Sequence, residues 1–162
     1  MQSQSKILDL SSAVRKVKNW QSEGLKVVFT NGCFDLLHLG HVDYLEKAGH
    51  LGDKLAVALN TDDSIQRLKG KSRPVLDEVS RQRIMAALEF VDLVILFDED
   101  TPLKVIEAIR PDILVKGSDY LAENIVGTNL VKSYGGEVKT LPLVEGKSTS
   151  EIINRILYLN KK

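Results

Sequence analysis

The sequence predicts an α/β fold, a single doubly wound, Rossmann-like domain whose parallel five-stranded sheet carries helices on both faces. Two observations support this prediction. Short, almost wholly apolar runs recur along the chain, and segments with helical spacing of apolar residues lie between them. Strands that are apolar on both sides are typical of a buried parallel sheet. The alternation of strand and helix is the pattern of parallel crossover connections.

Five runs are the candidate strands. The first, Lys26–Thr30, is β-branched and aromatic and ends at the turn-forming pair Asn31-Gly32. The other four are Leu55–Leu59, Leu93–Phe97, Ile113–Val115 and Val138–Leu141. Each is too short for a helix and too uniformly apolar for a half-exposed sheet, so we expect all of them to be buried.

Helical spacing predicts the segments between the strands. Residues 1–24 should contribute an N-terminal helix, Ser11–Trp20, that packs on the domain formed by residues 25–162. The other expected helices are His41–Leu51, Asp77–Leu88, Pro102–Arg110, Asn129–Tyr134 and Thr149–Leu159. Thr101 suits an N-cap with Pro102 at the first helical position. Ser148 and Glu151 have the spacing of a capping box.

Composition narrows the class of protein. The 22 Lys+Arg residues balance 22 Asp+Glu residues, which argues against a nucleic-acid partner. No apolar run is long enough to cross a bilayer, and the start lacks the apolar stretch of a signal peptide, so we expect no membrane partner and a cytoplasmic location. The single cysteine, Cys33, cannot form an internal disulfide, which fits a reducing compartment.

The turn after the first strand carries the clearest chemical signal. Gly32 and Gly40 let the backbone approach a ligand, and a helix that starts near His41 offers free N–H groups to an anion. Two imidazoles three residues apart, His38 and His41, could both hydrogen-bond one polyphosphate and stabilise its developing charge. This arrangement indicates phosphoryl or nucleotidyl transfer. A metal-binding pair and ordinary surface histidines are the alternatives.

The glycine pattern disfavours two other phosphate-binding classes. The turn after the first strand contains neither G-x-G-x-x-G nor G-x-x-x-x-G-K-[ST], which argues against a dehydrogenase and a P-loop kinase.

Gly32–Asp35 followed by His38-x-Gly40-His41 resembles the signature of the cytidylyltransferase-like nucleotidyltransferase superfamily. Within it, the chain is most similar to the adenylyltransferases that act on D-glycero-β-D-manno-heptose 1-phosphate in ADP-heptose synthesis. Five blocks bear this finer resemblance: Thr30–Asp35, Leu68–Pro74, Glu99–Pro102, Pro111–Tyr120 and Gly135–Val138. Leu143 and Lys147 stand where a related cytidylyltransferase branch has arginine and isoleucine, so the contact to the base stays unassigned.

The resemblance implies a role for each of several residues. The expected catalytic residues are His38, His41 and Lys71. Besides these three, the nucleotide-binding residues would be Cys33, Phe34, Gly40, Arg73, Gly146, Ser148, Thr149 and Ser150. The sugar phosphate would contact Asp35, Lys69, Lys116 and Asp119. Magnesium, the expected cofactor, would bind mainly through phosphate oxygens, with Asp119 as a candidate ligand.

Several of these residues have plainer interpretations. The cations between Lys69 and Arg73, expected on a flexible loop, could form a solvated turn. Residues 117–119 could form a simple turn, and Asp35 could cap the following helix. Ser148 could serve its capping box alone.

Arg81, Arg83 and Cys33 also carry expectations about burial. Arg81 and Arg83 are expected at the surface, because Ile84, Ala87 and Leu88 mark the expected buried side of their helix. Cys33 is expected to be a small buried residue, since no histidine–carboxylate relay marks it as a nucleophile.

The implied reaction is AMP transfer from ATP to a sugar 1-phosphate. The alternatives are transfer to another phosphorylated acceptor, such as glycerol 3-phosphate with CTP, and a nucleotide-binding module without turnover. Because the first strand already begins at Lys26, we expect the sugar kinase of the pathway to be a separate protein. A homodimer is also expected. The product would serve the lipopolysaccharide core or another surface glycan.

Overall fold

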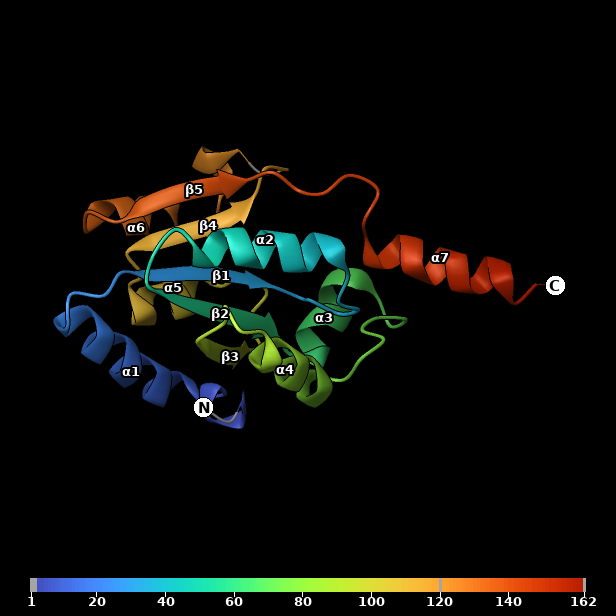
Figure 1. Cartoon of the computed structure of the whole chain (residues 1–162), viewed down its shortest axis with the longest axis horizontal. Helices are drawn as coiled ribbons and strands as arrows, with labels where there is room; N and C mark the ends of the chain where they lie inside the picture. The colour runs from blue at the N-terminus through green and yellow to red at the C-terminus, as the bar shows by residue number, and fades with distance from the viewer. Residues whose placement is uncertain (1–2, 120, 162) are drawn as a thin grey trace.

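The computed structural model describes residues 3–119 and 121–161, and these contain one parallel sheet with the strand order β3-β2-β1-β4-β5 (Figure 1). Residues 1 and 2 of the N-terminal segment, and Tyr120 of the block that ends there, lie outside the described residues. The strands are β1 (Val27–Gly32), β2 (Lys54–Asn60), β3 (Leu93–Phe97), β4 (Ile113–Gly117) and β5 (Glu137–Leu141). Neighbouring strands all pair in parallel, so the predicted fold class is confirmed.

Helices cover both faces of the sheet. They are α1 (Leu10–Ser22), α2 (Leu39–Gly49), α3 (Asp62–Lys69), α4 (Glu78–Ala87), α5 (Leu103–Ile109), α6 (Thr128–Ser133) and α7 (Thr149–Leu159), with short 3₁₀ turns η1 (Ser3–Lys6) and η2 (Ala122–Asn124). One apolar cluster joins α1, α5 and α6 to the face that carries Phe29, and another joins α2 and α4 to the face that carries Val28. Alternate residues of β1 therefore feed two cores. No helix among the described residues is long and apolar enough to cross a membrane.

Helix α3 is absent from the predicted elements. It begins after Thr61, whose side chain accepts the backbone N–H of Ser64, and it ends at Lys69. Only Ser64 and Ile65 of this helix are buried, so it lacks the apolar stripe by which a helix is found in a sequence. The expectation of a flexible loop that carries Lys69 is therefore wrong.

The buried face of α4 also differs from the prediction. Arg81, Met85 and Ala86 are buried in α4, whereas Ile84 is 39% exposed. The expectation that Arg81 is a surface charge is wrong, because this residue is only 1% exposed. Arg83, in contrast, is exposed as expected.

The two edges of the sheet are finished differently. Strand β5 has no buried residue, so the expectation of a buried strand is wrong for this edge. Its exposed Glu137 pairs with Lys139 at 3.0 Å. At the other edge, the backbone N–H of Leu8 donates to the carbonyl of Val94 in β3 at 3.0 Å. The N-terminal segment therefore occupies part of the β3 edge.

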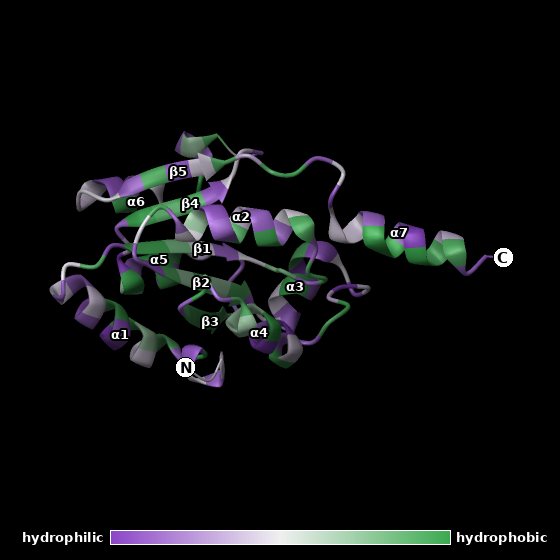
Figure 2. Ribbon diagram, in the orientation of Figure 1, coloured by the Kyte–Doolittle hydropathy of each residue, from purple (hydrophilic) through white to green (hydrophobic). Residues whose placement is uncertain are grey.

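Two helix starts carry detailed predictions. Helix α5 begins one residue late, because Pro102 is its N-cap and Leu103 its first residue. The capping box of α7 is confirmed: Ser148 Oγ accepts the N–H of Glu151 at 3.2 Å, and Glu151 Oε2 accepts the N–H of Ser148 at 3.0 Å. Helix α7 has no buried residue and extends away from the sheet, with apolar and polar residues interspersed along its length (Figures 1 and 2).

Candidate active site

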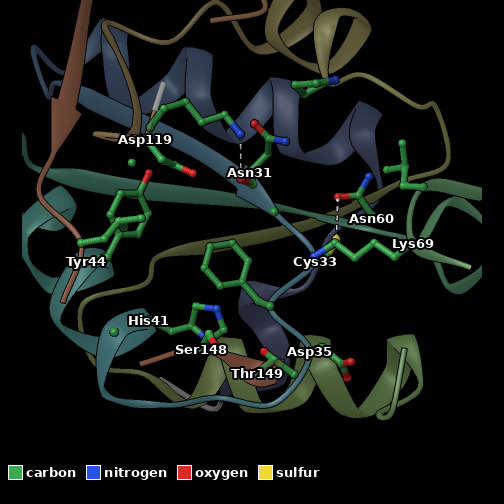
Figure 3. Close-up of a pocket in the computed structure, with 18 of the residues that line it drawn as sticks. Asn31, Cys33, Asp35, His41, Tyr44, Asn60, Lys69, Asp119, Ser148 and Thr149 are labelled. Atoms are coloured by element: carbon green, nitrogen blue, oxygen red, sulfur yellow. Dashed lines mark hydrogen bonds between the residues drawn. The ribbon is translucent and has the colours of Figure 1, made fainter. Parts of the chain in front are cut away.

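A cavity of about 670 Å³ lies at the carboxyl ends of the strands, where ligands bind in open α/β sheets (Figure 3). It is bounded by the β1–α2 turn, the ends of β2 and β4, the end of α3 and the start of α7. The predicted site residues that line it are Cys33, Phe34, Asp35, His38, Gly40, His41, Lys69, Arg73, Lys116, Asp119, Ser148, Thr149 and Ser150. Lys71 and Gly146 do not line it.

The β1–α2 turn has a tight backbone shape. Phe34 adopts a positive φ of 43°, and a Cβ on Gly32 would lie 2.9 Å from the Phe34 ring. That ring meets the ring of His41 edge-on, with centroids 5.1 Å apart. Gly40 is needed for a similar reason, because a Cβ there would lie 3.1 Å from the His38 ring. The two glycines therefore allow the aromatic rings to pack onto the turn.

The two histidines form a stacked pair at the start of α2. His38 is the N-cap residue and His41 lies in the first turn, and their ring centroids are 3.7 Å apart. Burial, with smaller contributions from His38 and Lys69, lowers the pKa of His41 to about 4. Burial also lowers the pKa of His38. Both imidazoles are therefore neutral at pH 7, and each has one N–H to donate.

Each ring also has an unpaired polar atom. Nδ1 of His38 and Nδ1 of His41 are buried and have no hydrogen-bond partner within the described structure. Buried polar atoms without a partner are costly and rare in folded proteins. The imidazole pair is therefore suited to a ligand that supplies the missing hydrogen bonds, such as a phosphate group.

Lys116 approaches the cavity from β4. Its Nζ donates to the carbonyl of Asn31 at 3.0 Å, and burial lowers its pKa to about 8 although Asp119 and Cys33 favour the charged form. Lys116 is therefore still mostly cationic at pH 7. In Figure 3, Asn31 and Asp119 lie across the cavity from His41.

Asp35 is committed to the loop before α4. This residue is 2% exposed, and its carboxylate accepts hydrogen bonds from Arg73 Nε and from the backbone N–H groups of Val75 and Leu76, all at 2.9 Å. The interpretation that Asp35 caps the following helix is wrong, because His38 occupies the N-cap position of α2. Asp35 instead fixes the loop that carries Arg73.

The predicted group of basic residues is divided. Lys69 ends α3 and lines the cavity, and this helix is held by ion pairs from Arg67 to Asp100 at 3.0 Å and to Asp98 at 3.4 Å. Lys71 lies two residues further on, on an exposed turn. The structure therefore brings Lys69 and Arg73 to the cavity, and leaves Lys71 outside its lining.

The start of α7 closes another side of the cavity. Ser148, Thr149 and Ser150 line it, and the first N–H groups of an 11-residue helix are available there for an anion. Gly146 has a φ of +65°, which favours glycine at this position, and this residue does not line the cavity. Cys33 is half-buried and is not enclosed in the core, and its Sγ is 4.0 Å from Asn60 Oδ1.

Sequence reasoning missed several lining residues. Asn60 is 4% exposed, ends β2 and donates through Nδ2 to Ser64 Oγ at 3.0 Å. Its position at the carboxyl end of a strand was a usable signal. Tyr44 carried no such signal. Its hydroxyl contacts Thr30 Oγ1 at 2.7 Å and donates to the carbonyl of Val115 at 3.1 Å, so it ties α2 to the sheet. The remaining missed residues include Asp100, Thr101 and Asn124.

Comparisons with known proteins agree with this arrangement. The sequence model described as Cytidylyltransferase-like matches residues 29–155. The bifunctional protein HldE of Methylobacillus flagellatus is 56% identical over 151 residues, which are 93% of this chain and 31% of that protein. HldE of Citrifermentans bemidjiense is 57% identical over 155 residues, 96% of this chain and 32% of that protein. The chain therefore spans about a third of the length of these relatives.

Solved structures show the same fold. A lipopolysaccharide core biosynthesis protein from Thermoplasma volcanium superposes with a TM-score of 0.61 at 34% identity, over 76% of this chain and all of that one. Pantoate–β-alanine ligase from Francisella tularensis has a TM-score of 0.61 at 16% identity, over 96% of this chain and 79% of that one. The second likeness concerns the fold alone.

Proposed function

This chain belongs to the cytidylyltransferase-like family, and from that premise we propose that it is the adenylyltransferase that converts ATP and D-glycero-β-D-manno-heptose 1-phosphate into ADP-heptose and pyrophosphate. The observation that carries the proposal is the stacked, neutral pair His38 and His41, which faces a cavity that also contains Lys69 and Lys116. The choice of sugar rests on the five sequence blocks and on the similarity to HldE.

The proposed reaction needs positioning more than proton transfer. A phosphate oxygen of the sugar attacks the α-phosphorus of ATP, a new P–O bond forms, and the bond to the bridging oxygen breaks as pyrophosphate leaves. The nucleophile is already an anion, so no general base is required. Neutral imidazoles that donate N–H groups to phosphate oxygens stabilise the charge that develops during transfer.

The cations around the histidines would hold the substrates. Lys116 extends from β4 and Arg73 from the loop before α4, and Lys69 ends α3, a helix whose Arg67 pairs with Asp100. In this proposal Lys69, Lys116 and Asp119 contact the sugar phosphate, and Asp35 contributes to the same subsite by holding Arg73 at the cavity. Lys71 keeps its proposed catalytic role, and the exposed turn that carries it closes over the triphosphate.

The proposed metal is magnesium. No cluster of three or more histidine, cysteine or acidic side chains suited to a metal occurs among residues 3–119 and 121–161. The carboxylate of Asp119 lines the cavity beside Gly117, where a Cβ on the glycine would lie 2.5 Å from Asp119 Oδ1. This donor set fits an ion held mainly by phosphate oxygens, with Asp119 as a protein ligand. When bound, magnesium would neutralise part of the phosphate charge.

Pyrophosphate release tests the proposal directly. We expect rapid release with ATP and heptose 1-phosphate, and little release when CTP or glycerol 3-phosphate replaces either substrate. Faster release with CTP and glycerol 3-phosphate would assign the other acceptor. ATP binding without release for any pair would identify a non-catalytic nucleotide-binding module.

Two partners are also part of the proposal: a separate kinase that makes the sugar 1-phosphate, and a second copy of this chain in a homodimer.

The pH dependence should report Lys116. Its pKa is lowered to about 8, so the cation that attracts phosphate is present below pH 8 and is lost as the pH rises through that value. We expect kcat/KM for the sugar 1-phosphate to fall above about pH 8 in the wild type, because kcat/KM reports the enzyme before that substrate binds. In Lys116→Met kcat/KM should be lower than in the wild type below about pH 8, where the wild-type cation is present, and it should lack this alkaline decline. An unchanged decline in the variant would assign it to another group.

A further inference from the structure

Arg81 is a buried cation that does not line the cavity. Its side chain is fully buried in α4, and all three of its guanidinium nitrogens donate hydrogen bonds. Nη1 donates to the carbonyl of Cys33 at 2.8 Å, Nε to the carbonyl of Leu76 at 3.1 Å, and Nη2 to Asp62 Oδ1 at 2.7 Å. The guanidinium therefore joins the β1–α2 turn, the loop before α4 and the start of α3.

The anchor for this guanidinium is itself fixed. Asp62 and Glu78 exchange hydrogen bonds, since the N–H of Asp62 donates to Glu78 Oε2 at 2.9 Å and the N–H of Glu78 donates to Asp62 Oδ2 at 3.1 Å. These two hydrogen bonds connect the starts of α3 and α4. Arg81 connects both helices to the turn that carries Phe34, whose ring packs on His41.

The bond to Cys33 acts on a strained part of the turn. The carbonyl of Cys33 belongs to the peptide that precedes Phe34, the residue with a positive φ of 43°. Side-chain-bearing residues rarely adopt this conformation unless their surroundings enforce it. A charge-assisted hydrogen bond to that peptide supplies such a constraint. It thereby holds the Phe34 ring in its edge-on contact with His41.

Stability alone does not explain an arginine at this position. A buried ion pair is costly to desolvate, and a well-packed apolar side chain often gives equal or greater stability. The forked guanidinium does something that an apolar side chain cannot, because it directs separate N–H groups at two carbonyls and a carboxylate.

We propose that Arg81 is a positioning residue that fixes the Cys33-Phe34 turn and so keeps the Phe34 ring packed on His41 for transfer. The kinetic part of this inference rests on the function proposed above. The structural part is independent of that function, because it concerns only the packing of the Phe34 ring against His41.

The test compares two arginines of the same helix. Arg81→Lys keeps the charge but loses the fork, and Arg83→Lys makes the same exchange at an exposed position that does not line the cavity. The imidazole titration of His41 is followed by NMR in both variants and in the wild type, at a temperature where all three are folded. The charged groups that face this ring, His38, Lys69 and Asp35, are the same in all three proteins.

In Arg81→Lys, we expect the pKa of His41 to rise by about one unit from its value near 4, because a loosened Phe34 admits water. We expect kcat to fall about tenfold or more, with KM for ATP changed less than about threefold. Arg83→Lys should match the wild type in both respects. A folded Arg81→Lys protein with a wild-type His41 titration would overturn the inference.

The titration separates this inference from the proposed function. If no substrate pair gives turnover even in the wild type, the proposed function fails, while the shift of the His41 pKa still tests the role of Arg81. If Arg81→Lys does not fold, the variant Asp62→Asn takes its place in the experiment, because it weakens one of the three hydrogen bonds of Arg81. A smaller rise of the His41 pKa is then expected, and no rise would overturn the inference.

Discussion

Replacement of His41 by asparagine is expected to lower turnover about a hundredfold or more, with a modest change in ATP affinity. His41 is a neutral donor held between Phe34 and His38, so it is already oriented before the substrate arrives. The asparagine amide is smaller and cannot stack in the same way. A donor that acts mainly in the transition state affects kcat more than ground-state binding.

His50→Asn is the matched control for this experiment. His50 follows the same helix as its C-cap residue and is exposed, and it does not line the cavity. Single-turnover pyrophosphate release and ATP titration are measured for both variants. His50→Asn should behave as the wild type, and near-normal turnover in His41→Asn would contradict the role proposed for His41.

Replacement of Asp35 by asparagine is expected to lower the free energy of unfolding by about 3 kcal/mol. The carboxylate is almost wholly buried and accepts hydrogen bonds from Arg73, Val75 and Leu76. The substitution leaves the cationic Arg73, whose side chain is only 15% exposed, without its carboxylate partner. It also weakens the bonds to two backbone N–H groups.

Asp43→Asn provides the comparison for Asp35→Asn. Asp43 pairs with Lys47 on the surface of α2 at 2.8 Å, with the two side chains 30% and 47% exposed. An exposed i,i+4 pair contributes only about 0.3–0.5 kcal/mol. Urea unfolding of both variants gives the difference. Equal midpoints would show that Asp35 does not anchor the loop before α4.

The strands were predictable because their sequences are simple. Four of the five predicted runs lie in strands whose residues are largely buried, where apolar side chains are needed on both faces. Ligands bind at the carboxyl ends of such strands, and this rule alone places His38, His41 and Lys116 at one end of the sheet. The same rule, applied to β2, adds Asn60.

What the sequence could not reveal depends on distant partners. Arg81 is buried because a carbonyl 48 residues earlier in the chain accepts its N–H, and no local pattern reports such a contact. Helix α3 has too few buried residues for a periodic signal. Helix α3 ends at Lys69, so Lys69 lines the cavity and Lys71 does not. Because the helix was not predicted, this separation of the two lysines was not predicted either.

The finish of the two sheet edges bears on self-association. An edge strand exposes backbone N–H and C=O groups that can pair with a strand of another molecule and start aggregation. At β3 the backbone of Leu8 already occupies part of that edge, and at β5 the outward Glu137 and Lys139 place charge beside it. Both edges therefore discourage strand-to-strand pairing between copies of the chain. The carboxyl ends of the strands can stay open to a ligand while the edges of the sheet resist association.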